Sequence, residues 1–397
     1  MTGPGGEILV GNCRERLREL AAESAHCVVT SPPYWGLRDY GTEPVAWGDG
    51  WVGSLGLEPT PEMYVTHILE VFREVRRVLR PDGTLWLNLG DSYAHGGNGA
   101  RDEERWPKQH RNNGGDRIQH AKKGAELKPK DLAMLPAEVA LMLRGDGWWL
   151  RSDIIWAKPN PMPESVTDRP TIAHEHVFLL TPGERYFYDA EAVREPGEPY
   201  RVKQPDGWDT GPGGHGSFHR NGRDAGRTSD EVRSGRNLRS VWTIATQPYP
   251  EAHFATFPEE LARRCIAAGT SERGCCPVCG APWRRVMKRT AMVVREGPGR
   301  AGLRGAAPNA ASRTAITGTM LAPATAITTG WQPTCAHGAE AVPCTVLDPF
   351  AGSGTTLAVA DMLGRRSIGI ELKPEYIRLI VERVRRRREK ANARRST

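Results

Sequence analysis

One glycine-containing segment has the composition of a cofactor-binding turn. It runs from Asp348 to Thr356 (DPFAGSGTT), after an apolar run and before a helix-like stretch. Gly352 and Gly354 let the backbone approach a ligand closely, and a helix N-terminus offers free N–H groups. Glu371 ends the next apolar run and can accept hydrogen bonds from ribose hydroxyls. No Gly-Lys-Ser/Thr follows, which disfavours an ATP-binding loop, so we expect a nucleoside cofactor rather than a mere tight turn.

A second segment has groups that can activate an amine. It runs from Thr30 to Tyr34 (TSPPY), directly after a short buried run. An exocyclic amine of a nucleobase is a poor nucleophile because its lone pair is delocalised into the ring. The Pro32 carbonyl and the Ser31 hydroxyl can accept both N–H protons and so free that lone pair, while Tyr34 can stack on a flipped base. Catalysis would then depend on positioning and electrostatics. Alone, the segment would indicate an ordinary turn.

A third group of residues has the spacing of a structural zinc site. Cys276 and Cys279 form a Cys-x-x-Cys-Gly half-site, and Cys335 with His337 can complete it. Cys275 and Cys344 are rival ligands, and a set of free thiols is the alternative. Eight cysteines in a chain expected to be cytoplasmic argue against disulfides. No thioredoxin-like unit surrounds the Cys-x-x-Cys pair, which disfavours redox catalysis.

Alternating strands and helices are expected to position these segments. Strands are predicted over 8–10, 26–30, 84–89, 148–156, 177–181, 345–347 and 367–370, and helices over 13–22, 61–79, 136–144, 258–268, 354–363 and 375–390. Pro81 to Gly83 is expected to form a turn that ends a helix, and Thr256 to Glu259 has the form of a capping box with Pro258 as first helical residue. The alternation predicts an α/β fold with a mostly parallel sheet.

Composition limits the class of protein. The 397 residues, 39% of them hydrophobic, suffice for a large domain with inserts. No apolar run is long enough for a membrane span and no signal peptide is evident, so we expect a cytoplasmic protein without a membrane partner. The net charge of +7 fits a polyanionic partner. For the basic run from Arg383 to Arg388 we favour a solvated helix end over direct DNA contact.

These segments together resemble the β class of DNA amino-methyltransferases, which use S-adenosylmethionine (AdoMet). DPFAGSGTT resembles their AdoMet motif and TSPPY their catalytic motif, and two further stretches, 156–170 and 253–258, are similar to the same family. The catalytic motif precedes the AdoMet motif, as in that circularly permuted class. The resemblance implies a Rossmann-like AdoMet-dependent methyltransferase fold with catalytic residues Ser31, Pro32, Pro33 and Tyr34. It implies AdoMet contacts from Thr30, Phe257, Pro258, Asp348, Pro349, Phe350, Gly352, Ser353, Gly354, Thr355 and Glu371.

The target base is predicted from one position. By resemblance, Ser31 favours the N4 amine of cytosine, and an aspartate there would favour the N6 amine of adenine, which stays the alternative. Methylation at cytosine C5 needs a cysteine nucleophile, and we interpret the Pro343-Cys344 pair beside the other cysteines as structural or metal-related. Two different functions stay open: a non-catalytic DNA-binding protein, and a methyltransferase that acts on RNA or protein amines.

Two basic stretches are candidates for contacts with double-stranded DNA. By resemblance, target recognition falls between about 190 and 250, where arginines can contact phosphates or guanine edges: Arg201, Arg220, Arg223, Arg227, Arg233, Arg236 and Arg239. A solvated loop is the alternative for most of them. The Gly- and Arg-rich stretch 95–130 is expected to be a mobile loop that orders on DNA.

The expected domain plan follows from these assignments. The methyltransferase core is predicted over 1–94, 131–190, 251–273 and 345–397, with the mobile loop at 95–130, target recognition at 191–250 and a zinc-ribbon-like insert at 274–344. A monomer or homodimer is expected, and a cognate restriction endonuclease is a partner that the resemblance suggests.

Overall fold

The computed structural model describes residues 2–3, 6–37, 39–94, 127–195, 236–247, 257–289, 293–296, 318–322 and 326–395. These divide into two compact units. The first comprises Met1–Asp189, Arg239–Arg284 and Pro333–Thr397, and the second comprises Ala190–Leu238 and Arg285–Gln332. Within the described ranges, no helix combines the length and the apolar character that a membrane span requires.

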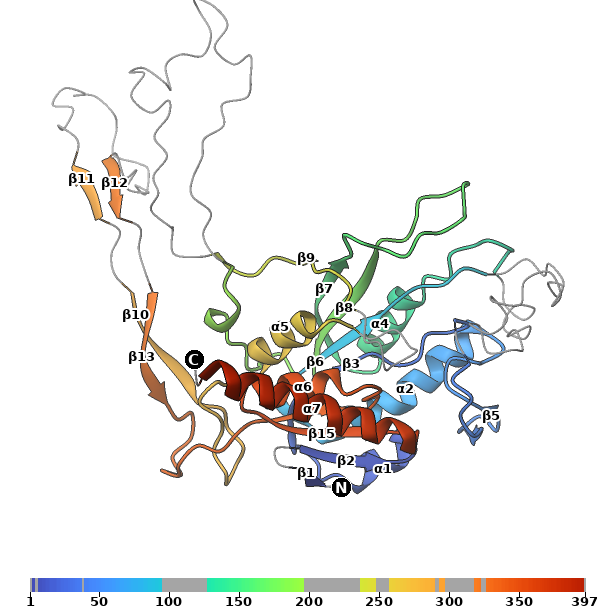
Figure 1. The fold of residues 1–397 in the computed structure, drawn as a ribbon, viewed down its shortest axis with the longest axis horizontal. Helices are drawn as coiled ribbons and strands as arrows, with labels where there is room; N and C mark the ends of the chain where they lie inside the picture. The colour runs from blue at the N-terminus through green and yellow to red at the C-terminus, as the bar shows by residue number, and fades with distance from the viewer. Residues whose placement is uncertain are drawn as a thin grey trace, which may run out of the picture. The chain divides into compact units, whose positions relative to one another are not determined.

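The first unit is built on a nine-stranded sheet (Figure 1). In spatial order its strands are β1 (Thr2–Gly3), β2 (Gly6–Val10), β15 (Arg366–Glu371), β14 (Thr345–Asp348), β3 (Ala25–Thr30), β6 (Leu79–Leu89), β8 (His174–Thr181), β7 (Trp149–Ala157) and β9 (Val241–Thr243). The five strands from β2 to β6 in this order are mutually parallel, whereas β8 runs antiparallel to both its neighbours. The prediction of a mostly parallel α/β sheet is confirmed.

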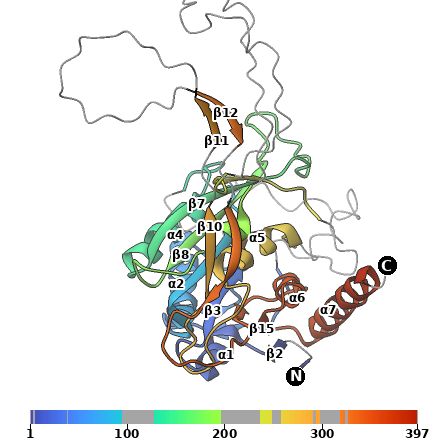
Figure 2. The same cartoon turned by 90° about the vertical axis from the view of Figure 1, so that its left-hand side faces the viewer.

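Helices cover both faces of this sheet. One group contains α1 (Cys13–Glu19), α2 (Pro61–Val78) and α4 (Leu135–Gly145), and the other contains α5 (Glu259–Gly269), α6 (Thr355–Met362) and α7 (Pro374–Arg395). Figure 2 shows the two groups on opposite sides of the sheet. Thr60 caps α2 by accepting a hydrogen bond from the Met63 N–H, and Pro61 opens the helix, as its fixed φ allows. The apolar face of α2, including Phe72 and Val75, packs into the buried core.

Two local predictions were wrong. Pro81 to Gly83 does not separate α2 from a later strand, because β6 already begins at Leu79. The register with β3 shifts between the Ala25–Leu79 and Cys27–Thr84 pairs, so this segment bulges from the ladder without ending the strand. Pro258 is the N-cap of α5 and not its first helical residue, and it provides no side-chain cap. Thr256, the other half of the predicted capping box, lies outside the described residues.

The remaining strands are short. β4 (Val45–Ala46) and β5 (Val52–Gly53) form a two-stranded antiparallel sheet in the first unit. In the insert, β10 (Arg284–Arg289) pairs with β13 (Ala326–Gln332), and β11 (Val293–Glu296) pairs with β12 (Gly318–Ala322). The 3-10 helix Glu191–Val193 and an isolated bridge between Glu195 and Arg236 belong to the second unit.

Candidate active site and metal site

The two predicted motifs follow neighbouring parallel strands. TSPPY begins at the last residue of β3 and DPFAGSGTT at the last residue of β14. These two strands pair, with Leu347 opposite Val28. A buried hydrogen bond of 2.7 Å from Thr30 Oγ1 to Asp348 Oδ1 joins the two strand ends. A second, of 3.1 Å, runs from Thr356 Oγ1 to the Val29 carbonyl. The carboxyl ends of parallel strands are the usual ligand-binding edge of such sheets, so the motifs share one site.

The glycine-containing turn has the backbone conformation that its sequence predicts. Gly352 has φ of 51° and Gly354 has φ of 79°, both in the left-handed region that favours glycine. A Cβ on Gly354 would lie 2.8 Å from Ile380 Cγ2, so a larger residue would also clash with α7. The Gly352 N–H donates to Glu371 Oε2 at 2.8 Å, and the Lys373 N–H donates to Oε1 at 2.9 Å. Glu371 therefore fixes the turn and keeps lone pairs for further donors.

Burial alters the acidity of both carboxyl groups at this edge. Burial raises the pKa of Asp348 to about 6, although hydrogen bonds from Thr30 and Thr356 act in the opposite direction. Burial also raises the pKa of Glu371 to about 7. Perturbed carboxyl groups of this kind concentrate at functional sites.

Arg383 connects the turn to α5, a role that was not predicted from the sequence. Its buried guanidinium donates to Ser353 Oγ at 2.7 Å and to Thr355 Oγ1 at 2.8 Å. Its other amino group lies 3.5 Å from Glu259 Oε1, at the start of α5. Phe257 and Pro258 directly precede Glu259, so this contact holds their segment near the turn. His253 to Thr256, the rest of that predicted family-like stretch, lies outside the described residues.

The predicted catalytic motif, TSPPY, is part of a polar network. Ser31 Oγ donates to the Tyr34 hydroxyl at 3.1 Å, and that hydroxyl donates to Glu175 Oε2 at 2.7 Å. Asn88 Nδ2 donates to the Tyr34 oxygen and to Glu175 Oε2, both at 2.8 Å. Lys158 Nζ forms an ion pair with Glu175 Oε1. Asn88 Oδ1 is buried and, among the described residues, has no hydrogen-bond partner, so the site can still accept a donor.

Asn88, Lys158 and Glu175 were not predicted as site residues. Each lies within or beside a predicted strand or family-like stretch: Asn88 in 84–89, Lys158 in 156–170, and Glu175 just before 177–181. Polar residues at strand ends were the available signal. Pairing of β6 with β8 brings Asn88 and Glu175 together, and this pairing is not evident from local sequence.

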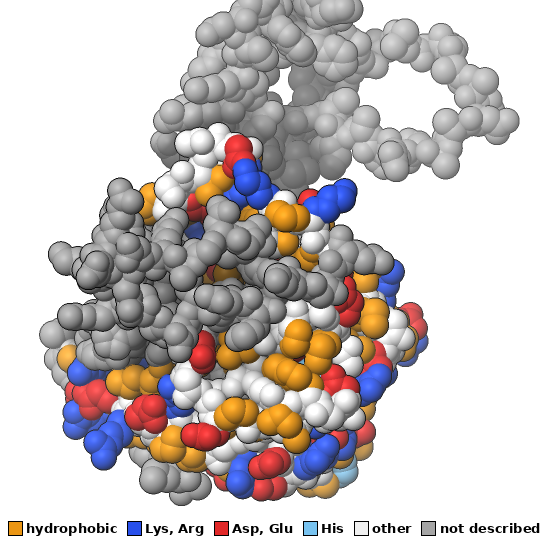
Figure 3. Space-filling view, turned by 90° about the vertical axis from the view of Figure 1, so that its right-hand side faces the viewer, with side chains coloured by type: hydrophobic (Ala, Val, Ile, Leu, Met, Phe, Trp, Pro, Cys, Tyr) orange, Lys and Arg blue, Asp and Glu red, His pale blue; other side chains and the backbone are white. Residues whose placement is uncertain are grey.

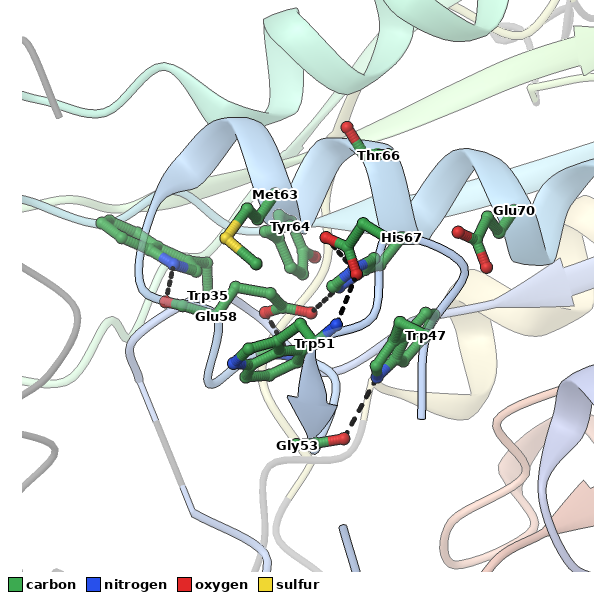
Figure 4. Close-up of polar contacts among 12 residues, drawn as sticks. Trp35, Trp47, Trp51, Gly53, Glu58, Met63, Tyr64, Thr66, His67 and Glu70 are labelled. Carbon is green, nitrogen blue, oxygen red and sulfur yellow. Dashed lines mark hydrogen bonds and ion pairs between the residues drawn. The ribbon is translucent and has the colours of Figure 1, made fainter. Parts of the chain in front are cut away.

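A buried cluster under α2 holds the loop that follows the motif (Figure 4). Tyr64 donates its hydroxyl to the Pro33 carbonyl at 2.9 Å, and the Trp35 indole donates to the Glu58 carbonyl at 2.9 Å. His67 contacts Glu58 Oε1 at 3.0 Å, and both side chains are 0% exposed. The His67 ring stacks against the rings of Trp47 and Trp51. These contacts fix the backbone at Pro33 and so orient the preceding Pro32 carbonyl.

Tyr64→Phe tests this support. We expect a loss of about 0.5–1.5 kcal/mol in unfolding free energy, because one hydrogen bond to a partly buried carbonyl is removed. The turnover rate should fall modestly, since the ring still packs but the Pro33 carbonyl is free to move. Urea unfolding and steady-state kinetics measure the two effects. Tyr188→Phe, on the segment after β8, provides a matched tyrosine control that should keep full turnover.

The predicted metal ligands lie together. One ligand atom from each of Cys276, Cys279, Cys335 and His337 lies within 4.8 Å of the others. A tetrahedral zinc ion with bonds of about 2.0–2.3 Å spaces its ligand atoms about 3.5–3.8 Å apart, which this group approaches. The Gly280 N–H donates to the Cys276 carbonyl at 2.8 Å and Gly280 has φ of 69°, the tight turn that a Cys-x-x-Cys-Gly half-site needs. Three thiols and an imidazole are a donor set that fits zinc.

The rival ligands fall in a separate group. Cys275 and Cys344 lie with His26, again within 4.8 Å of one another. Both nitrogens of His26 are engaged, Nε2 with the Gly280 carbonyl at 2.9 Å and Nδ1 with the Thr345 N–H at 3.1 Å. Two thiols remain in this group, too few for a closed four-ligand zinc site. They contact backbone carbonyls instead, Cys275 Sγ that of Val342 at 3.5 Å and Cys344 Sγ that of Ser271 at 3.9 Å.

The predicted DNA-contacting stretches are mostly beyond the described residues. Residues 95–126 and 196–235, with Arg201, Arg220, Arg223, Arg227 and Arg233, lie outside them. Arg236 forms an ion pair with Glu195, with Nε 2.6 Å from Oε2. On the face drawn in Figure 3, basic and acidic side chains are interspersed among the described residues. The charged side chains of this face therefore do not mark it as a DNA-binding surface.

Most arginines of the basic run in α7 form ion pairs within the chain. Arg387 pairs with Glu259 and Arg388 with Asp361, and Arg385 and Arg386 pair with Glu382 on their own helix. The favoured prediction of a solvated helix end is therefore wrong in part, because the run lies in the interior of α7 and Arg383 is buried. Direct DNA contact by the exposed arginines stays a prediction.

The chain is similar to known proteins both in fold and in sequence. One similar solved structure is the PvuII DNA methyltransferase, described as cytosine-N4-specific. The similarity covers 96% of this chain and 87% of that one, with a TM-score of 0.51 and 17% sequence identity, which supports a shared methyltransferase fold. A model of the DNA methylase family matches residues 25–276 and 344–382. The Type II methyltransferases M.SmaI of Serratia marcescens and M.Cfr9I of Citrobacter freundii are 36% and 34% identical over 96% of this chain, and 91% and 88% of theirs. The chain belongs to the DNA methylase family and is a DNA amino-methyltransferase, as the resemblance implied.

Proposed function

We propose that this protein transfers the methyl group of AdoMet to the N4 amine of cytosine at a specific site in duplex DNA. The hydrogen bond between Thr30 and Asp348 is the main support, because it brings the cofactor turn next to Ser31. AdoMet, when bound, supplies an electrophilic methyl group. Thr30, Phe257, Pro258, Ser353, Thr355 and Glu371 with the backbone of 348–354 would hold it.

The chain's own residues activate the amine. A cytosine flipped from the duplex presents its amino group to Ser31 Oγ and the Pro32 carbonyl, which accept the two N–H bonds. Ser31 donates its proton to Tyr34 and accepts from Asn88 Nδ2 at 3.4 Å, so one lone pair of its oxygen is left for the amine. Pro33 rigidifies the turn, and Tyr34, whose ring packs beside Gly90 and whose hydroxyl is held by Glu175, forms one wall for the base. No covalent enzyme intermediate is needed.

N6-adenine methylation is the alternative, since the same acceptors activate that amine. We favour cytosine because Ser31 occupies the position where the family's adenine enzymes more often have aspartate. We further propose that Cys276, Cys279, Cys335 and His337 bind a structural zinc ion, that 191–250 recognises the target sequence, and that a cognate restriction endonuclease recognises the same sequence.

AdoMet affinity should depend on pH. Glu371 must be ionised to accept both ribose hydroxyls, and burial raises its pKa to about 7. The dissociation constant is therefore expected to rise as the pH falls through 7, by at most about tenfold per pH unit. Isothermal titration calorimetry between pH 5.5 and 8.5 measures this. Glu371→Gln should bind AdoMet weakly at every pH tested and show no change in affinity around pH 7. If the wild-type protein bound AdoMet equally well at pH 6 and pH 8, Glu371 would not be the ribose-binding carboxylate.

The proposed activity is tested by methyl transfer. Tritiated AdoMet is incubated with the protein and with mixed-sequence duplex DNA, duplex RNA or a protein mixture in parallel. We expect label on duplex DNA alone. Label on RNA or protein alone would overturn the proposed substrate, and no label on any substrate would favour a non-catalytic DNA-binding protein.

A further inference from the structure

We propose that Glu175 is the final acceptor of the proton that the amine loses during methyl transfer, and that Ser31 and Tyr34 relay this proton. The inference rests on the proposed function and deepens it. A methylated amine must release one proton to regain neutrality, and neither Ser31 nor Pro32 is a base strong enough to keep it. A carboxylate connected to the motif therefore completes the chemistry.

The hydrogen bonds form a continuous, directed path. Ser31 Oγ donates to the Tyr34 oxygen at 3.1 Å, and Tyr34 donates to Glu175 Oε2 at 2.7 Å. Asn88 Nδ2 holds both the Tyr34 oxygen and Glu175 Oε2 at 2.8 Å and so fixes the geometry. Asn88 Oδ1 is buried without a described partner beside this path, which indicates that a donor from outside enters here. A base amine is such a donor.

Two side chains with titratable groups contact Glu175 directly. Lys158, from the end of β7, forms an ion pair with Glu175, and Tyr34 is the other titratable group that faces it. His174 and His176 adjoin Glu175 on β8 and project from the opposite face. Burial raises the pKa of Tyr34 well above its usual value, and Glu175 raises it further, so Tyr34 stays a neutral phenol that can donate. The Glu175 side chain is 16% exposed, which lets the proton leave to water afterwards.

The relay conserves protons and electrons. The amine nitrogen forms a bond to the methyl carbon while the carbon–sulfur bond of the donor breaks and its electron pair stays on sulfur. The amine proton moves to Ser31 Oγ, the Ser31 proton to the Tyr34 oxygen, and the Tyr34 proton to Glu175 Oε2. Ser31 and Tyr34 end neutral, Glu175 ends protonated, and the methylated amine is neutral.

Glu175→Gln tests the inference in the full-length enzyme. The amide keeps the shape and still accepts a hydrogen bond from Tyr34, but it cannot take the proton. We expect kcat to fall by roughly 10²-fold, a typical contribution of general base catalysis, with KM for DNA and AdoMet affinity unchanged. Tyr34→Phe should cause a similar loss of kcat because it interrupts the relay. Asp153→Asn is the matched control, since Asp153 pairs with His176 beside Glu175 and should keep full activity.

Two outcomes would overturn the relay. Glu175→Gln with wild-type kcat would do so, as would a defect confined to KM or AdoMet affinity, which a positioning role alone explains. If Glu175→Gln does not fold, Tyr34→Phe carries the test, because it removes the hydroxyl that links Ser31 to Glu175, and a wild-type kcat in that variant would overturn the relay. Failure of the proposed function is distinct, because wild-type enzyme would then place no methyl group on DNA.

Discussion

We expect Ser31→Ala to lower the rate of methyl transfer by about 10²–10³-fold while AdoMet binding is retained. Removal of one preorganised polar group at the reacting centre typically costs this much. Ser31 also donates to Tyr34, so the substitution removes both the proposed acceptor for the amine and the start of the proposed relay. Single-turnover kinetics with preformed enzyme–DNA complex measure the chemical step, and calorimetry measures the affinity for AdoMet.

The control for this variant is a serine at the other end of the same strand. Ser24 precedes β3 as Ser31 follows it, and its hydroxyl donates to the Ala21 carbonyl at 2.7 Å, at the far end of the strand from the site. Ser24→Ala should transfer methyl groups at the wild-type rate. If Ser31→Ala kept the wild-type rate, the assigned amine-activating role would be wrong, and if it lost AdoMet binding, Ser31 would belong to the cofactor site instead.

We expect Cys279→Ser to abolish the proposed zinc binding and to lower the melting temperature of the protein. Structural zinc sites contribute about 10–16 kcal/mol of apparent binding free energy in small zinc domains, so loss of one ligand is severe. The half-site is also tied to the core, because Arg80 donates to the Cys279 carbonyl at 2.6 Å and His26 contacts the Gly280 carbonyl. Disorder in the half-site would therefore reach β3 and β6.

Elemental analysis after purification without chelators measures the metal, with one zinc per chain expected. Cys13→Ser, in α1 and remote from the group, should keep both zinc and stability. If the wild-type protein contained no zinc, or if Cys279→Ser kept all of it, the proposed four-ligand site would be wrong and its four side chains would be free.

The strands and the glycine-containing turn could be predicted because their sequence patterns lie within short segments. Apolar runs located β3, β6, β14 and β15, and the glycines of the cofactor turn predicted its backbone because only glycine adopts those φ values easily. Proline at position 81 misled the prediction, since a register shift lets β6 accommodate it. Propensity cannot indicate such a shift, which depends on the neighbouring strand.

Contacts between distant segments account for what was missed. Glu175 joins the site because β8 pairs antiparallel with β6 and sets it beside Asn88. Arg383 belongs to a run of arginines for which a solvated helix end was predicted, yet in α7 it is hydrogen-bonded to Ser353. The buried Glu58–His67 pair depends on the loop between β5 and α2 folding against that helix. None of these pairings has a signature at short spacing.

The identity of the methylated nucleoside tests the central claim most directly. Duplex DNA treated with the enzyme and AdoMet is digested to nucleosides and analysed by chromatography with mass spectrometry. We predict N4-methyldeoxycytidine, separated by retention time from 5-methyldeoxycytidine of the same mass. N6-methyldeoxyadenosine would contradict the cytosine assignment based on Ser31, and 5-methyldeoxycytidine would contradict direct attack by an activated amine.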